Sequence, residues 1–228
     1  MFVEILIYIY LGICAGMILF NIVTALLSRR RAHRFHRRST RFEKEISREL
    51  DRLAETGEVS AEHLRRMERK LRRVNNMVTY DQALERLLPC RPALVRDYLL
   101  ASSGVVVTLA EDYCRRDEIE SAYFPYLIKK YRLLSGESCP ELKAMLLDLL
   151  HEPSLYCREN TMQAIYTSGD PVLVVQALQI INADSYYYSG KLLSDGLLNY
   201  TGSSQVLAYA LWCVLAKFQP WLQVALLN

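Results

Sequence analysis

The sequence predicts an all-α protein in which an N-terminal transmembrane helix is followed by a solenoid of stacked helical hairpins. Three observations indicate this fold class. Residues 5–27 form an almost uninterrupted apolar stretch. From Ala93 onward the chain is a series of helix-length segments separated by short breaks, and no segment shows the alternation typical of strands. The later part of the chain contains an internal repeat, which is typical of stacked helical units.

The apolar stretch at residues 5–27 is long enough to cross a bilayer. At about 1.5 Å of rise per residue it extends about 35 Å, whereas a hydrocarbon core is about 30 Å thick. A cleaved signal peptide would instead carry basic residues before its apolar region, and here the only charged residue in that position is Glu4. We therefore predict a single-pass protein of the cell membrane.

A cluster of arginines follows the apolar stretch and predicts its orientation. It consists of Arg29, Arg30, Arg31, Arg34, Arg37, Arg38 and Arg41. The positive-inside rule places such a cluster in the cytoplasm, so we expect the N-terminus outside and residues 29–228 inside. The same arginines are expected to bind anionic lipid headgroups. Nucleic-acid binding is the alternative, but the position beside a membrane helix favours lipid.

Two glycines inside the predicted span are spaced for helix packing. Gly12 and Gly16 form a G-x-x-x-G step, which lets two helix backbones approach closely in lipid. Asn21, a polar residue near the inner end of the span, also indicates a partner helix. These residues predict either a homodimer or contact with another membrane protein. The alternative is that glycine is simply common in membrane helices.

Charge and pattern divide the chain into three predicted parts: an anchor at 1–28, a basic juxtamembrane segment with amphipathic helices at 29–78, and a helical repeat domain at 79–228. Residues 29–74 hold 16 Lys and Arg against 8 Asp and Glu, whereas residues 75–228 hold 12 against 16. Because the acidic distal part would repel phosphates, we expect no nucleic-acid partner.

Local signals predict several helix ends. Thr40 to Glu43 has the form of a capping box, which predicts a helix that starts there and ends at Gly57. Ser60 is expected to cap the following helix, and Thr79 is expected to start another. Pro125 is expected to kink or split the helical segment in which it lies.

The sequence has no recognisable catalytic or metal-binding pattern. It lacks a Gly-rich phosphate loop, G-x-S-x-G and H-E-x-x-H. No cysteines stand at C-x-x-C spacing, so we interpret all six as reduced apolar side chains: Cys14, Cys90, Cys114, Cys139, Cys157 and Cys213. The four histidines are too scattered to form a ligand set: His33, His36, His63 and His151. We therefore expect no cofactor, no metal and no enzymatic activity.

The internal repeat has an offset of 33 to 34 residues. Residues 164–169 are echoed by 198–202, and residues 176–178 by 209–211. Each unit is a helix, a Gly-containing turn and a second helix. Such pairs cannot bury their apolar faces alone, so they stack on their neighbours.

One unit resembles a HEAT repeat. Residues 154–165 are similar to its first helix, Gly169-Asp170-Pro171 to its internal turn, and residues 172–181 to its second helix. The resemblance extends to residues 189–217 and is slight over 92–152. It implies a rigid concave scaffold that binds other proteins. Arg158 and Asp170 match structural ladder positions of that family, so the resemblance assigns them to architecture.

Aromatic side chains indicate where a protein partner would bind. The candidate interface residues are Tyr186, Tyr187, Tyr188, Trp212 and Trp221. The alternative is that the tyrosines clamp a turn between repeats. The apolar C-terminal end either folds back on the preceding repeat or docks a partner, and folding back is favoured.

We predict a non-enzymatic, membrane-anchored scaffold or adaptor for membrane-associated protein partners, such as a membrane enzyme or transport complex. An envelope-polysaccharide glycosyltransferase is one plausible client. The alternatives are a HEAT-like enzyme of the lyase or glycosylase type, and an anionic-lipid-binding module that organises the membrane.

Overall fold

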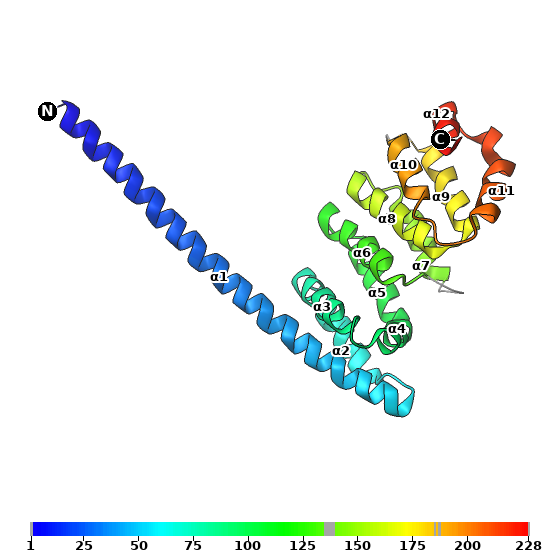
Figure 1. Cartoon of the computed structure of the whole chain (residues 1–228), viewed down its shortest axis with the longest axis horizontal. Coiled ribbons are helices and arrows are strands. Elements are labelled where there is room, and N and C mark those ends of the chain that lie inside the picture. Colours follow the sequence, from blue (N-terminus) through cyan, green and yellow to red (C-terminus); the bar gives the residue numbers. More distant parts are fainter. Residues whose placement is uncertain (1, 135–139, 185, 187, 228) are drawn as a thin grey trace.

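The computed structural model describes residues 2–134, 140–184, 186 and 188–227 (Figure 1). Within these residues all regular structure is helical, with no strand, which confirms the all-α class. The elements are α1 (Phe2–Thr56), α2 (Ala61–Leu71), α3 (Val74–Leu87), α4 (Pro92–Ala101), α5 (Ser103–Tyr113), α6 (Glu118–Tyr131), α7 (Pro140–Leu149), α8 (Leu155–Ser168), α9 (Pro171–Ala183), α10 (Gly190–Leu197), α11 (Ser204–Val214), the 3-10 turn η1 (Leu215–Lys217) and α12 (Pro220–Leu227).

Helix α1 is a single helix of 55 residues. Its N-terminal part stands apart from the other helices, whereas its C-terminal part packs against them (Figure 1). The predicted helix start at Thr40 is wrong: α1 passes through this position, and the Thr40 hydroxyl donates a hydrogen bond to the His36 carbonyl oxygen inside the helix. No Gly or Pro lies between Arg29 and Thr56, so the helix continues to Gly57, where φ is +74°.

The other predicted helix ends have mixed outcomes. Ser60 occupies the N-cap position of α2, as predicted, but its side chain makes no capping hydrogen bond. Thr79 does not start a helix: α3 begins at Val74, and the Thr79 hydroxyl donates to carbonyl oxygens one turn earlier in the same helix. Pro125 does not split its segment, because α6 continues through it from Glu118 to Tyr131.

Helices α2–α12 and the C-terminal part of α1 form the body of the protein. Within it, α3 runs parallel to α1. Asn75, at the start of α3, lies beside residues 31–38 of α1, and Arg86, near its end, forms an ion pair with Glu43 (3.2 Å). The N-terminal end of α3 therefore points in the same direction as the N-terminal part of α1.

Helix α2 runs antiparallel to α1. The backbone N–H of Ser60 donates to the Glu49 carboxylate, and ten residues later Lys70 donates to the Glu45 carboxylate, one turn nearer the start of α1. The turn between α2 and α3, residues 72–73, therefore lies on the side of the α1 arginines. We call this end of the body the arginine end and the opposite end the far end.

The turns of the two repeated units lie side by side at the far end. The Thr201 N–H donates to the Tyr166 carbonyl oxygen (3.2 Å), and its hydroxyl donates to the Thr167 carbonyl oxygen (3.0 Å). The Tyr200 hydroxyl donates to the Gly169 carbonyl oxygen (2.8 Å). The α8–α9 turn thus contacts the α10–α11 turn, at nearly equivalent positions of the two units.

The C-terminal helix folds back, as favoured from the sequence. Leu222 and Ala225 of α12 are buried against α10, and the Ser194 hydroxyl donates to the Ala225 carbonyl oxygen (2.9 Å). The other face of α12 stays exposed, with Val224 and Leu227 in solvent. The two predicted domain boundaries, after residues 28 and 78, fall inside α1 and α3, respectively.

Candidate functional site

The first candidate site is the apolar part of α1. Its described side chains are exposed from Met17 to Leu27, apart from partly exposed Thr24, and Gly12 and Gly16 have no neighbouring atom within 4 Å of an added Cβ. This helix is long and apolar enough to cross a membrane. Asn21 is exposed as well. Nothing within the described part of the chain covers this apolar surface.

A second apolar segment, α4 and α5 together, would also be long enough if it were straight. The two helices are bent by 63° at Ser102. Val95 and Tyr98 of α4 and Leu109 and Tyr113 of α5 are buried in the body. These helices therefore use their apolar residues in the core, unlike the start of α1.

The α1 arginines named from the sequence are all exposed: Arg29, Arg30, Arg31, Arg34, Arg37, Arg38 and Arg41. Within the described residues, none has a carboxylate at ion-pair distance. Arg31, Arg34 and Arg38 lie on one side of the helix, where they surround a groove with Phe35 and with Asn75 of α3. A second basic depression lies next to it on α2 and α3, lined by Arg66, Arg69, Lys70, Arg73 and Asn76.

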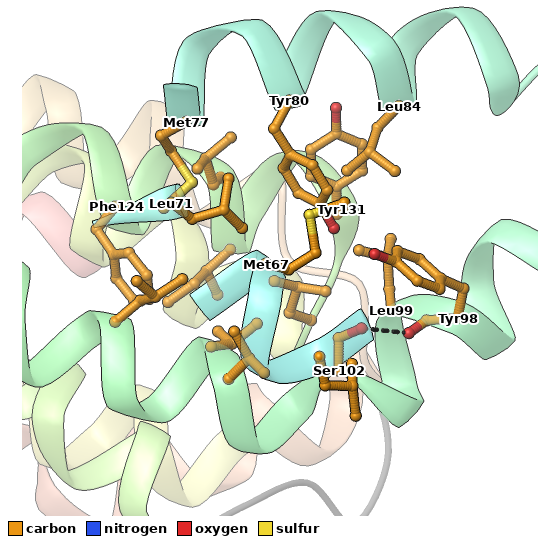
Figure 2. A pocket seen from close by; sticks show the side chains of 17 residues that line it. Met67, Leu71, Met77, Tyr80, Leu84, Tyr98, Leu99, Ser102, Phe124 and Tyr131 are labelled. Atoms are coloured by element: carbon orange, nitrogen blue, oxygen red, sulfur yellow. Dashed lines mark hydrogen bonds between the residues drawn. The ribbon is translucent and has the colours of Figure 1, made fainter. Parts of the chain in front are cut away.

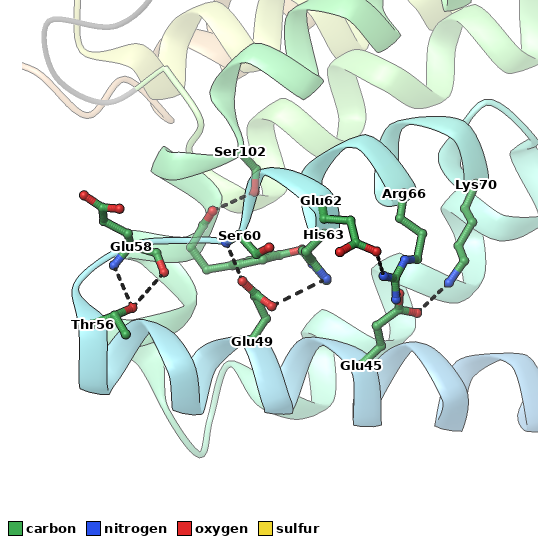
Figure 3. Close-up of polar contacts among 11 residues, drawn as sticks. Glu45, Glu49, Thr56, Glu58, Ser60, Glu62, His63, Arg66, Lys70 and Ser102 are labelled. Atoms are coloured by element: carbon green, nitrogen blue, oxygen red, sulfur yellow. Dashed lines mark hydrogen bonds and ion pairs between the residues drawn. The ribbon is translucent and has the colours of Figure 1, made fainter.

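Polar contacts fix α1 to α2 (Figure 3). Glu45 accepts a hydrogen bond from Lys70 (2.6 Å) and forms an ion pair with Arg66 (3.7 Å). One turn further along α1, Glu49 accepts from the N–H of Ser60 (2.5 Å). Both carboxylates project from the same side of α1 as the buried apolar residues, so they fix the rotation of α1 relative to the body. We call this set of contacts the α1–α2 joint.

His63 is the buried member of the joint. Its Nε2 atom lies 2.9 Å from the Tyr98 hydroxyl, and its Nδ1 atom lies 3.9 Å from the Glu49 carboxylate. Burial lowers the pKa of His63 below its usual 6.5, against the opposing effect of Glu49. Burial also raises the pKa of Tyr98 well above 10. Neutral imidazole and phenol are therefore paired here, and neither reaches an open cleft.

The cavity beside the joint is apolar and small (Figure 2). It lies among α2–α6, and its lining includes Met67, Tyr80 and Phe124. The enclosed space is about 40 Å³, whereas pockets for small-molecule substrates occupy about 300–1,000 Å³. The cavity is therefore a packing defect of the core and does not resemble a substrate site.

A charged cluster that the sequence did not suggest connects α3 and α6. Asp81, on α3, accepts hydrogen bonds from Tyr123 (3.0 Å), Lys130 (2.7 Å) and Tyr131. Lys130 also pairs with Glu85 (2.7 Å). Burial and the Asp81 carboxylate raise the pKa values of Tyr123 and Tyr131. Both Asp81 carboxylate oxygens are occupied, so this cluster holds helices together and offers no free acid or base.

The cysteines and histidines that the structure describes are scattered over the body and α1. Within the described residues, no group of three His, Cys, Asp or Glu could hold a metal ion. Burial raises the pKa of Cys114 to about 11 and also raises that of Cys157, which disfavours the reactive thiolates. Cys139 lies outside the described residues.

The predicted aromatic interface is brought together only in part. Tyr186, Tyr188 and Trp221 line an open groove of about 800 Å³ between the α9–α10 connection and α12. Tyr186 and Trp221 are exposed, whereas Tyr188 is buried and its hydroxyl donates to Glu159 (2.7 Å). Trp212 is 69% exposed on α11 and does not line the groove. Tyr187 lies outside the described residues.

The two ladder residues have different surroundings. Asp170 caps α9 by accepting from the N–H groups of Val172 and Leu173, and it forms an ion pair with Lys143 (2.8 Å). Burial opposes ionisation, but these donors together lower the pKa of Asp170 below 3.8. The guanidinium of Arg158 lies 4.9 Å from the centre of the Tyr186 ring, at the edge of the groove.

Comparison with known proteins gives no family assignment: no protein-family model, no curated protein and no solved structure matches the chain. The similarity to HEAT repeats therefore stays a prediction from the sequence. Function has to be argued from the apolar helix, the basic surface and the aromatic groove.

Proposed function

We propose that the protein is a membrane-anchored, non-enzymatic scaffold that holds a helical body in the cytoplasm and binds a membrane-associated protein. The observation that carries this proposal is the exposed apolar start of α1, followed directly by arginines that have no carboxylate partner within the described residues. Such a surface is costly in water and favourable in lipid. The arginine position supports a single pass with the N-terminus outside.

The body is proposed to be a short HEAT-like α-solenoid. Support comes from the contact between the α8–α9 turn and the α10–α11 turn, in which Thr201 bonds to Thr167, 34 residues earlier. Asp170 at the head of α9 and its pairing with Lys143 are consistent with the structural role that the resemblance assigns to Asp170. A solenoid of this kind offers its partner a rigid surface.

We propose the groove lined by Tyr186 and Trp221 as the protein-binding site. Tyrosine and tryptophan give large contact areas and are enriched among the residues that contribute most to interface energy. The groove is open, and Val224 adds exposed apolar surface next to Trp221. It is therefore suited to an apolar side chain or a short helix of a partner. Its client is proposed to be a membrane enzyme or transport complex, such as an envelope-polysaccharide glycosyltransferase.

Three features support a non-enzymatic role. The apolar cavity among α2–α6 is far smaller than a substrate pocket. The Asp81 carboxylate is fully engaged by Tyr123, Lys130 and Tyr131. Burial raises the pKa values of the Cys114 and Cys157 thiols. Lyase or glycosylase chemistry would require convergent acid, base or nucleophilic groups in a cleft.

The groove can be tested by photo-crosslinking in intact cells. A benzophenone amino acid in place of Trp221 is expected to capture one specific membrane-associated protein. The matched control carries the same probe in place of Trp212, which is also an exposed tryptophan but lies outside the groove. The same capture pattern at both positions, or no specific capture at position 221, would refute the assignment of this groove.

The topology can be tested with the natural cysteines. Cys90 and Cys213 are exposed on the body, so a membrane-impermeant maleimide is expected to label them only after the cells are opened. Labelling in intact cells would place the body outside. Extraction of the protein by salt without detergent would show that α1 is not inserted in the bilayer.

A further inference from the structure

The turns at one end of the body form a continuous surface next to the α1 arginines. The α5–α6 connection reaches the α2–α3 turn, because the Tyr113 hydroxyl donates to the Leu71 carbonyl oxygen (2.9 Å) and Arg116 bonds to the Arg72 carbonyl oxygen. Arg72 also pairs with Asp112, at the end of α5 (3.2 Å). The α5–α6 connection therefore belongs to the arginine end.

The remaining helices continue this surface away from α1. The Asn160 side chain of α8 donates to the Ala122 carbonyl oxygen (3.0 Å), so α8 and α6 begin at the same end. His151, in the α7–α8 connection, lies 3.5 Å from Asp184 at the end of α9. The row α3, α6, α8, α10 accordingly extends sideways from α1, on the side that faces the N-terminal part of that helix (Figure 1).

Two large side chains project from the arginine end without cover. Ile119, in the first turn of α6, is 84% exposed, and Tyr156, in the first turn of α8, is 80% exposed. The two helices are neighbours in the body. Both helices begin at the arginine end, so these two side chains project from the same end of the body. Tyrosine is enriched at membrane–water interfaces, and exposed apolar side chains can enter the headgroup layer.

The part of this end closest to α1 is basic. Arg69, Arg73 and Arg115 are exposed, and within the described residues none of them has a carboxylate at ion-pair distance. Near this part, Asp112 pairs with Arg72 and Glu120 with Arg116, whereas Asp117, which caps α6, and Glu152 form no ion pair within the described residues. Exposed unpaired arginines attract anionic lipid within about 8–10 Å at physiological salt.

The arginine end of the body lies close enough to the end of the apolar stretch of α1 to contact lipid headgroups. Asn75, at the arginine end, lines a groove with residues 31–38 of α1. These residues follow Leu27 by about 6–16 Å of helix, whereas the headgroup layer adds about 5–8 Å on each side of the hydrocarbon core. The α1–α2 joint fixes the body at this position. A tilted α1 would bring the row of turns onto the membrane surface.

We propose that the arginine end of the body lies on an anionic lipid surface, with Ile119 and Tyr156 in the headgroup layer. This inference rests on the proposed membrane anchor. It gives the body a fixed orientation, in which the far end points into the cytoplasm. The aromatic groove, which begins at the α9–α10 connection, then opens at the membrane surface, where a membrane-associated partner would be found.

The orientation can be tested with single-tryptophan variants of the full chain. In a background that carries Trp212→Phe and Trp221→Phe, one variant adds Ile119→Trp and the matched control adds Leu198→Trp. Leu198 is 85% exposed, which matches Ile119, but it lies at the far end, directly before the α10–α11 turn. Circular dichroism checks that each variant retains its helix content.

Both variants are reconstituted in vesicles of phosphatidylcholine and phosphatidylglycerol, with or without brominated acyl chains. We expect brominated lipid to quench the tryptophan at position 119 at least three times as strongly as the tryptophan at position 198. Equal quenching, or none at position 119 in protein that floats with the vesicles, would overturn the orientation and leave the anchor intact. Protein that does not float with the vesicles would overturn the anchor and the orientation together.

The role of charge is tested by removing arginines. Arg69→Ala with Arg73→Ala is expected to reduce the quenching at position 119 at least twofold, as is replacement of the anionic lipid by phosphatidylcholine. The control is Arg96→Ala, an exposed arginine of α4 that has no ion pair within the described residues. Quenching that is unaffected by the double substitution and by lipid charge would contradict the electrostatic part of the proposal.

Discussion

The two parts of α1 belong to one continuous helix and have opposite surroundings. From Met17 to Leu27 its apolar side chains are exposed, whereas Phe42, Ile46 and Leu50 are buried in the body. Hydropathy does not explain the difference, since both parts carry large aliphatic residues. The spacing of the apolar residues explains the difference: those of the later part recur on one side of the helix, and those of the earlier part surround it.

This comparison shows how one continuous helix can have one part suited to lipid and another part suited to packing against other helices. A helix that is apolar all round can be covered by lipid, whereas a helix with one apolar stripe packs against other helices. Between the two parts lies the stretch Arg29 to Arg41, which carries seven exposed arginines. The helix needs no break there, because its backbone hydrogen bonds are satisfied internally in either environment.

The largest expected effect comes from truncating the buried part. Ile46→Ala should destabilise the body by about 2–5 kcal/mol, because it removes a fully buried side chain and leaves a cavity. Ile22→Ala is the matched control: the residue is an isoleucine of the same helix, but 50% exposed. The measurement is urea unfolding of the full chain in detergent micelles. Similar losses for the two variants would break the comparison between the two parts of α1.

The second prediction concerns the α1–α2 joint. Glu45→Ala removes the partner of Lys70 and Arg66, and it should destabilise the body by about 1 kcal/mol because the two cations remain partly exposed and can hydrate. Glu55→Ala, on the exposed face of the same helix, should change stability by less than about 0.5 kcal/mol. Equal midpoints for the Glu45 variant and the parent chain would show that the joint does not hold α1.

Some helix boundaries could be predicted because the residues that set them act locally. Gly57 ends α1, and the Gly169-Asp170-Pro171 turn separates α8 from α9. The side chain of Asp117 caps α6, although the sequence analysis did not assign it that role. The prediction of a helix start at Thr40 was wrong because a capping box stabilises the N-terminus of a helix but does not interrupt a longer helix that passes through it. An uninterrupted arginine-rich helix was already present there, and the threonine hydroxyl bonds back into it.

The sites were less predictable because they depend on packing between distant segments. Asp81 meets Tyr123 and Tyr131 across 42 and 50 residues, and no local pattern indicates such a pairing. Composition did identify Tyr186 and Trp221 as candidates, but only the fold of α12 places them in one groove and leaves Trp212 outside it. The packing of α6 on α8 brings the helix that carries Ile119 next to the helix that carries Tyr156, and this too has no local signal in the sequence.

A third prediction concerns pH. Burial lowers the folded-state pKa of His63 below 6.5, so the unfolded chain binds more protons as the pH falls through 6.5. Stability from neutral His63 is therefore present above pH 6.5 and is lost below it. The facing groups are Glu45, Glu49, Arg66 and Lys70.

The measurement is the urea midpoint of the parent chain and of His63→Gln at pH 7.5 and 5.5. The parent should lose more stability over this interval than the variant, since glutamine does not titrate. Identical pH dependence in the two proteins would show that His63 is not held neutral by burial.

The smallest effect on the body is expected from the glycines of the apolar part of α1. An added Cβ at Gly12 or Gly16 meets nothing within 4 Å, so Gly12→Ile with Gly16→Ile should leave the urea midpoint of the body unchanged. If these glycines form a close contact between two copies, the same change should weaken self-association at least tenfold, because bulky side chains separate the helix backbones.

Energy transfer between labelled chains in micelles measures this association. The control, Leu19→Ile with Leu26→Ile, introduces two isoleucines in the same part of α1 without changing side-chain volume. A loss of body stability in the glycine variant would mean that the apolar part of α1 contacts the body after all. Unchanged self-association would remove the glycine-mediated homodimer and leave the exposed apolar surface to lipid or to another membrane protein. In either case, the experiment separates the role of the exposed apolar part of α1 from that of its buried part.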